Sequence, residues 1–183
     1  MRIYRPRDVF NFASNGDIAR LTKALTISSN RGNWYLKNGR NALHAAAVSG
    51  HLSCANILLN SGIDVNSRTT QNDSALSLAT SFYRLECMEL LLARGADINY
   101  RYDEIQTTLH HAAMFGHEEC VWLLLDAGAA IDEDDIDSYK PLSHQDFTDC
   151  RPLIIYEIEN RRNRTAYDTF IHHHIEYRPC INQ

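Results

Sequence analysis

The fold is decided by the stretch Asn41-Ala42-Leu43-His44-Ala45-Ala46-Ala47-Val48-Ser49-Gly50-His51, which continues to Leu58-Leu59-Asn60-Ser61-Gly62-Ile63-Asp64-Val65-Asn66. The same pattern begins again, at equal intervals and without gaps, at Ser74-Ala75-Leu76 and at Thr107-Thr108-Leu109. A fourth copy begins one interval later at Lys140-Pro141-Leu142 and then decays, and an N-terminal copy is recognisable over residues 9–17. A fixed period of about 33 residues predicts an array in which each unit stacks on its neighbours.

Each unit is predicted to be a helix, a tight reversal and a second helix. Asn41, Ser74 and Thr107 are residue types that begin helices. Glycines follow both helices and permit the left-handed backbone that ends them, at Gly50, Gly116, Gly62, Gly95 and Gly128. Helices of about 8–10 residues are too short to be stable alone, so stacking must supply the stability.

These residues resemble the ankyrin repeat, whose pattern is a Thr-Pro-Leu-His start, an Ala-Ala-x-x-Gly-His helix turn and a Leu-Leu-x-x-Gly-Ala-Asp-Val-Asn end. The resemblance covers roughly residues 8–158. It implies L-shaped units joined by β-hairpin-like turns, with a concave face made of turn tips and first helices. His44 and His110 match the repeat's own His, which bonds backbone between units. In the second full repeat Tyr83-Arg84 replaces Gly-His and Ser77 replaces the His, which predicts a looser or reshaped turn.

The expected fold class is all-α, an ankyrin-repeat solenoid of about four to five helix–turn–helix repeats with a C-terminal capping helix. We expect an N-terminal capping repeat over residues 1–36 and ankyrin repeats over residues 37–149. Residues 150–183 should hold a degenerate last-repeat helix and the capping helix, because Tyr167, Phe170, Ile171 and Ile175 form a helix-period stripe that should pack on the last repeat.

The cysteines indicate a reduced protein. Cys54, Cys87 and Cys120 are one repeat period apart, at one inner position of the second helix. Neighbouring units stack at about 8–10 Å, too far for a disulfide, so buried thiols are expected. They favour a cytoplasmic or nuclear location. Metal binding is not expected, because the consecutive side chains of His172-His173-His174 on a helix point about 100° apart and cannot hold one ion.

Composition narrows the function classes. A net charge of −5 speaks against nucleic-acid binding, and no apolar stretch approaches the ~18 residues of a membrane span. Residues 1–40 hold eight Lys/Arg and two Asp/Glu, whereas residues 41–150 hold five and seventeen. This uneven distribution of charge either reflects ordinary solvated surface or serves to steer a partner electrostatically. No nucleophile, phosphate-loop or paired-carboxylate motif is present, so neither an enzyme nor a cofactor is expected.

The family resemblance places a partner-binding surface at the hairpin tips and at the ends of the first helices. The expected tip residues are Tyr35, Arg40, Arg68, Asp73, Arg101, Glu104 and Tyr139. The expected helix-end residues are Phe82, Met114, Phe115 and Phe147. Aromatic, Met and Arg side chains are the usual anchors of protein interfaces. The alternative is that these aromatic residues fill gaps between helices.

Asn66 and Asn99 resemble the sites of the asparaginyl hydroxylase that modifies ankyrin repeats, since each ends a Gly-x-Asp-Val/Ile-Asn turn with a Leu eight residues earlier. The alternative is that each Asn bonds its own turn backbone. The resulting functional hypothesis is a monomeric, non-enzymatic module that binds a partner protein through the concave face, as an adaptor or inhibitor. The alternatives are a secreted or viral effector-type inhibitor of host signalling and a self-associating scaffold.

Overall fold

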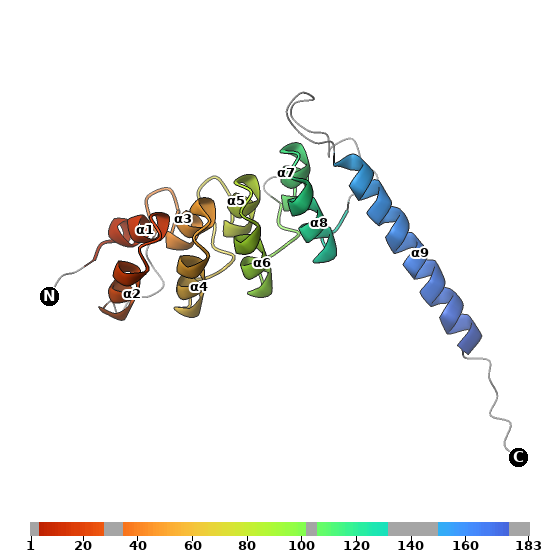
Figure 1. The fold of residues 1–183 in the computed structure, drawn as a ribbon, viewed down its shortest axis with the longest axis horizontal. Coiled ribbons are helices and arrows are strands. Elements are labelled where there is room, and N and C mark those ends of the chain that lie inside the picture. Colours follow the sequence, from red (N-terminus) through yellow and green to blue (C-terminus); the bar gives the residue numbers. More distant parts are fainter. Residues whose placement is uncertain (1–3, 28–34, 102–105, 132–149, 176–183) are drawn as a thin grey trace, which may run out of the picture.

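The computed structural model describes residues 4–27, 35–101, 106–131 and 150–175, with side chains from residue 163 onward described only for Arg164. Four helix pairs are followed by one long helix (Figure 1). The pairs are α1 (Pro6–Ser14) with α2 (Ile18–Ile27), α3 (Ala42–Ser49) with α4 (Leu52–Asn60), α5 (Ala75–Ser81) with α6 (Leu85–Ala93), and α7 (Thr108–Met114) with α8 (Glu118–Asp126). The long helix is α9 (Arg151–Ile175).

The pairs stack into two layers. The first helices α1, α3, α5 and α7 contact one another in sequence, and the second helices α2, α4, α6 and α8 form the other layer (Figure 1). Two antiparallel bridges, Arg68 with Ser74 and Arg101 with Thr107, close the hairpin-like connections that lead into α5 and α7. The predicted all-α solenoid of helix–turn–helix repeats is confirmed.

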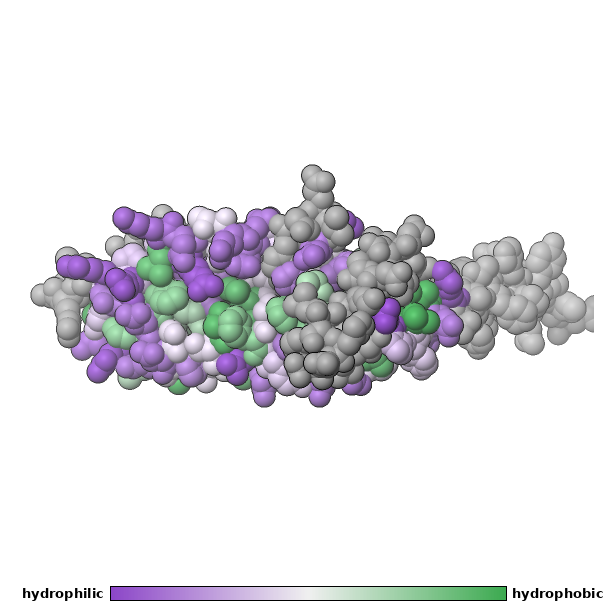
Figure 2. Space-filling view, turned by 90° about the horizontal axis from the view of Figure 1, so that it is seen from above, coloured by the Kyte–Doolittle hydropathy of each residue, from purple (hydrophilic) through white to green (hydrophobic). Residues whose placement is uncertain are grey.

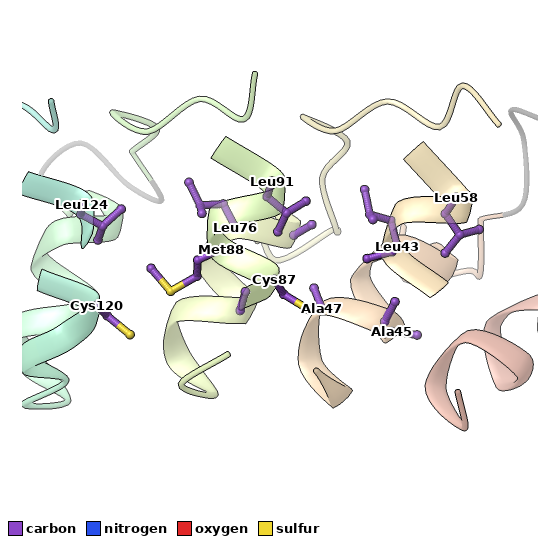
Figure 3. Close-up of a cluster of buried hydrophobic side chains, with 14 of the residues drawn as sticks. Leu43, Ala45, Ala47, Leu58, Leu76, Cys87, Met88, Leu91, Cys120 and Leu124 are labelled. Carbon is purple, nitrogen blue, oxygen red and sulfur yellow. The ribbon is translucent and has the colours of Figure 1, made fainter. Parts of the chain in front are cut away.

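The core runs along the stack between the two layers. Leu58, Leu91 and Leu124 occupy the same position of successive second helices and are fully buried (Figure 3). Small residues such as Ala46, Ala79 and Ala112 are buried on the first helices, where they permit the close approach of neighbouring helices. The repeat period therefore places equivalent side chains at equivalent depths.

Hydrogen bonds at His44 join one unit to the hairpin that follows it. The Nδ1 atom of His44 accepts the backbone N–H of Asn41 at 3.2 Å, and Nε2 donates to the carbonyl of Ser67 at 3.1 Å. The Asn41 amide donates to the Ser67 hydroxyl at 2.7 Å. This confirms, at His44, the bonding that the family resemblance implied. Ser77 at the equivalent position of the next unit bonds only locally, to the backbone of Ser74.

The turn at Tyr83-Arg84 is neither loosened nor reshaped, so the prediction of a looser or reshaped turn was wrong. Tyr83 adopts a left-handed φ of 55°, close to the 75° of Gly50 and the 62° of Gly116. The backbone N–H of Arg84 donates to the carbonyl of Ala79 at 2.8 Å, as the N–H of His51 does to Ala46 at 3.0 Å. The hydrogen bonds of the turn hold a bulky residue in a conformation that usually requires glycine.

The C-terminal region also differs from expectation, because α9 is one continuous helix where two were predicted. Its sequence contains no glycine, and its one proline lies in the first turn, so nothing breaks it. Ile154 and Ile158 are buried where α9 contacts α8, and the Arg161 guanidinium donates to the carbonyls of Leu125 and Ala129 at 2.9 and 2.8 Å. These bonds satisfy the Leu125 carbonyl in the last turn of α8 and the Ala129 carbonyl just after the helix. The predicted apolar stripe at Tyr167 and beyond lies outside the described side chains.

The α9 helix is 25 residues long, which is long enough to span a membrane, but it is rich in polar and charged residues. Of the helices that the structure describes, none combines the length and apolar character needed to cross a membrane.

The buried thiols generate a prediction. Cys54, Cys87 and Cys120 are free and at most 1% exposed, and burial raises the pKa of Cys87 to about 11 and that of Cys120 to about 12. Since the thiolate is the reactive form, we expect all three to resist a thiol reagent in the folded protein and to react after unfolding in guanidinium. Peptide mapping by mass spectrometry measures this. Rapid labelling of all three in the native state would contradict the structure.

His44 generates a second prediction, on pH. Its pKa is lowered from 6.5, chiefly because burial disfavours the charged form. The unfolded chain therefore binds more protons below about pH 6.5, and the free energy of unfolding should fall as the pH decreases from there towards the folded pKa. Denaturant unfolding at about pH 7.5 and about pH 5.5 measures the fall. The fall in the free energy of unfolding should be smaller in the variant His44→Ser, because serine is the residue at the equivalent position 77. An equal fall in the variant would mean that His44 is not the group responsible.

Candidate functional site

Aromatic side chains gather at the ends of the first helices in the middle of the stack. We call Phe82, Tyr83, Phe115 and His117 the aromatic ledge. Phe82 is 49% exposed and Tyr83 is 41% exposed, whereas Phe115 is half-buried. The Tyr83 ring meets the His117 ring edge-on at 5.1 Å, and Phe115 stacks on His117 at 5.7 Å. The ledge therefore spans two repeats. Figure 2 looks down on the first-helix layer and shows apolar surface among hydrophilic residues over the described repeats.

Tyr83 stands where two other turns require glycine. A Cβ atom on Gly50 would lie 2.9 Å from the Arg84 side chain, and one on Gly16 would lie 3.0 Å from the His51 ring. At position 83 the side chain is accommodated beside His117. A left-handed residue other than glycine costs about 1–2 kcal/mol, and 41% of Tyr83 remains exposed despite its contact with His117. Strained backbone of this kind is found often at functional positions.

The Tyr83 hydroxyl interacts with the carboxylate of Glu119 on α8. This interaction raises the pKa of Tyr83 to about 12 and lowers the pKa of Glu119. The ledge therefore approaches the second-helix layer at Glu119.

The residue after each turn has a structural role. The His51 ring bonds the carbonyl of Ser14 at 3.1 Å, and the His117 ring bonds that of Thr80 at 2.9 Å. Arg84 takes the same role, since its Nε donates to the carbonyl of Val48 at 3.0 Å. The unusual Tyr83-Arg84 pair thus keeps the contact between repeats while it adds an exposed aromatic ring.

The predicted tip residues differ in exposure, and some of them also contact the hairpins. Tyr35 and Arg101 are exposed, and Arg40 is half-buried. The Arg68 guanidinium lies 3.7 Å from the centre of the Tyr100 ring in the next hairpin, and an Asp73 carboxylate oxygen accepts a bond from the Thr69 hydroxyl at 3.1 Å. Arg68 and Asp73 therefore also stabilise the hairpins.

The remaining predicted residues are partly described. Met114 is half-buried at the end of α7, directly before Phe115. Glu104, Tyr139 and Phe147 lie outside the described residues. The structure thus brings Phe82 and the Met114-Phe115 pair to the same layer of helix ends, while the exposed tips lie on the hairpins.

Sequence reasoning missed a groove on the second-helix layer. We call it the outer groove; its volume is about 420 Å³ and it is lined by Leu85, Glu89, Glu119, Trp122, Leu123 and Asp126. Trp122 is 39% exposed and meets the ring of Tyr156, which is 57% exposed, edge-on at 6.2 Å. The signal was present in the sequence: Trp122 stands one repeat period after the exposed Glu89, so its register position faces solvent. In the described part of the chain, no group of three or more His, Cys, Asp or Glu is placed to hold a metal ion.

Asn66 and Asn99 bond the next repeat, which corrects the expectation that each bonds its own turn. The Asn66 side chain accepts the backbone N–H of Asp97 at 2.8 Å and donates to the carbonyl of Gly95 at 3.2 Å. The Asn99 side chain accepts the N–H of Ala130 at 2.7 Å. Hydroxylation of either residue stays a prediction, and it requires local opening of these bonds, which mass spectrometry after incubation with the hydroxylase would detect.

Comparison with known proteins agrees with this architecture. A family model described as ankyrin repeats (3 copies) matches residues 9–102 and 76–145, well over half of the chain. The chain belongs to the ankyrin-repeat family. No curated protein matches it.

The bonds of Asn66 generate a prediction on stability. Asn66→Ala removes two hydrogen bonds between repeats and should lower the free energy of unfolding by about 1–2 kcal/mol, since each exposed bond contributes modestly. Asn60→Ala is the control, because Asn60 is an exposed Asn at the end of α4 and should change stability by about 0.5 kcal/mol or less. Equal effects of the two substitutions in denaturant unfolding would show that the bonds of Asn66 contribute nothing.

Proposed function

We propose that this protein is a non-enzymatic binding module that occupies the surface of a partner protein through its concave face, as an adaptor or inhibitor in the cytoplasm or nucleus. Ankyrin repeats are generally protein–protein interaction modules. The observation that carries the proposal for this chain is the aromatic ledge, where two adjacent aromatic side chains remain about half exposed and one of them is held in a strained conformation.

The ledge has the chemistry of an interface centre. Tyr is enriched among the residues that dominate binding free energy, and aromatic anchors work best when a partner excludes water around them. Each anchor buries apolar area worth roughly 25 cal/mol per Å². The exposed tips Tyr35 and Arg101 would supply the polar rim, since their side chains extend from the hairpins beside the first-helix layer.

The proposed location in a reducing compartment is supported by the cysteines. The four described cysteines, Cys54, Cys87, Cys120 and Cys150, are buried thiols outside any disulfide. Free buried thiols are ordinary in the cytoplasm and nucleus, where disulfides are rare. An effector-type inhibitor that acts inside a host cell would meet the same conditions, so this alternative shares the site and differs only in the origin of its partner.

The test uses the chain's own repeats as the source of substitutions. Phe82→Ser with Tyr83→Gly gives the second repeat the Ser49-Gly50 turn of the first. Because glycine relieves the left-handed strain, we expect the melting temperature to change by only about 5 °C or less, while partner capture in affinity purification with quantitative mass spectrometry falls at least ~10-fold.

Leu52→Glu is the matched control. It removes an exposed apolar side chain from α4, outside the ledge, and introduces the residue type found at position 118, the equivalent position of α8. Capture should be unchanged in this variant. A collapse of the melting temperature in the ledge variant would mean that the aromatic residues are packing residues. A wild-type oligomer that the ledge variant dissociates, seen by sedimentation, would instead favour the self-associating scaffold.

A further inference from the structure

The outer groove combines an apolar floor with a rim of one charge. Leu85 and Glu89 come from α6, and Glu119, Trp122, Leu123 and Asp126 come from α8. Glu89, Glu119 and Asp126 are exposed, while Leu85 and Leu123 are half-buried. Of the described residues that line it, none is basic.

The helices around the groove extend this negative surface. Neither α6 nor α8 contains Lys or Arg, and both begin with exposed acidic residues, Glu86 on α6 and Glu118 on α8. Arg84 and Arg94 are engaged elsewhere: Arg84 bonds Val48, and Arg94 bonds the Asn56 amide oxygen at 2.6 Å. On the α9 side, Arg161 and Arg164 line the adjoining hollow with Trp122 and Asp126; Arg161 bonds the carbonyls of Leu125 and Ala129, and Arg164 is exposed. The interaction with the Tyr83 hydroxyl lowers the pKa of the Glu119 carboxyl group.

Trp122 provides the third feature. Its indole is partly exposed. The ring that it contacts on α9, Tyr156, is the most exposed large apolar side chain described. Trp is the aromatic residue that attracts a cation most strongly over its ring face. A Lys or Arg side chain can lay its aliphatic stem on the two leucines and place its charged head among carboxylates and indole.

We propose that the outer groove binds a basic segment of a partner protein, with a Lys or Arg side chain seated between Glu89, Trp122 and Asp126. This surface adjoins the ledge at Glu119 and adds a second partner to the proposed function. The groove repels nucleic acid and acidic lipid because its rim is negative. The chain's own basic N-terminal repeat lies at the opposite end of the stack (Figure 1), so it cannot fill the groove of the same molecule.

The experiment uses tryptophan fluorescence of the full chain. The chain contains two Trp residues, so Trp34→Phe leaves Trp122 as the reporter. The probe is a synthetic helical peptide of Lys, Leu and Ala, with a peptide of Glu, Leu and Ala as its counterpart. We expect a saturable emission change with the Lys peptide alone, weakened by added salt because the charges are exposed.

Charge-matched variants locate the binding. Glu89→Gln with Asp126→Asn neutralises two groove residues and should raise the Kd at least ~5-fold, as expected for two partly exposed charge contacts. Glu86→Gln with Glu118→Gln removes the same charge from the same two helices outside the groove lining and should raise the Kd by only about twofold or less, because these exposed charges act at longer range through screening salt. Phe82→Ala should leave the Kd unchanged, so failure of the ledge proposal would be distinguishable.

Four results would overturn the proposal. No saturable change with the Lys peptide would mean that the groove binds no cation. Equal weakening in both double variants would mean attraction by overall charge. Equal binding of the Glu peptide would mean apolar contact alone. Self-association in sedimentation that only Glu89→Gln with Asp126→Asn abolishes would mean that a second copy of this chain is the occupant.

Discussion

No helix of the four described pairs exceeds ten residues, and helices of that length are marginal in water. The stability of every unit therefore depends on contact with the units beside it. That contact has two components along the whole stack. Leu58, Leu91 and Leu124 fill the space between layers, and side chains such as His44 and Asn66 bond backbone groups of the following hairpin or repeat. Since each interface involves only neighbours, the array is stabilised locally and repeatedly.

This dependence also determines which positions remain for binding. Side chains at the inner positions of the helices are buried in the core. The side chain that follows each turn bonds the preceding repeat. At Tyr83-Arg84 the chain keeps that bond through the arginine side chain and gains an exposed aromatic ring at a glycine position. At Trp122 it uses an exposed position of the second helix. Both changes alter the surface without removing a contact that holds the stack.

Features that recur in every repeat could be predicted from the sequence, whereas features found in one repeat alone could not. The buried positions of Cys54, Cys87 and Cys120 followed from spacing alone, because one period fixes one depth. The turn at Tyr83 could not be predicted, since residue preferences disfavour its conformation and only the hydrogen bonds of the turn enforce it. The outer groove was missed because its shape depends on how α6 and α8 pack. Similarly, the roles of Arg68 and Asp73 within the hairpins depend on contacts that a repeat pattern does not specify.

Tyr83 in the ledge interacts with Glu119 in the groove. Coupling transmitted through this contact would be equal in both directions. Both residues are exposed, and interactions between exposed side chains contribute little because water and salt screen them. A coupling this weak changes an affinity by about fivefold or less. Under the two proposals, coupling this weak allows both surfaces to be occupied together, which an adaptor requires, whereas an inhibitor needs the ledge alone.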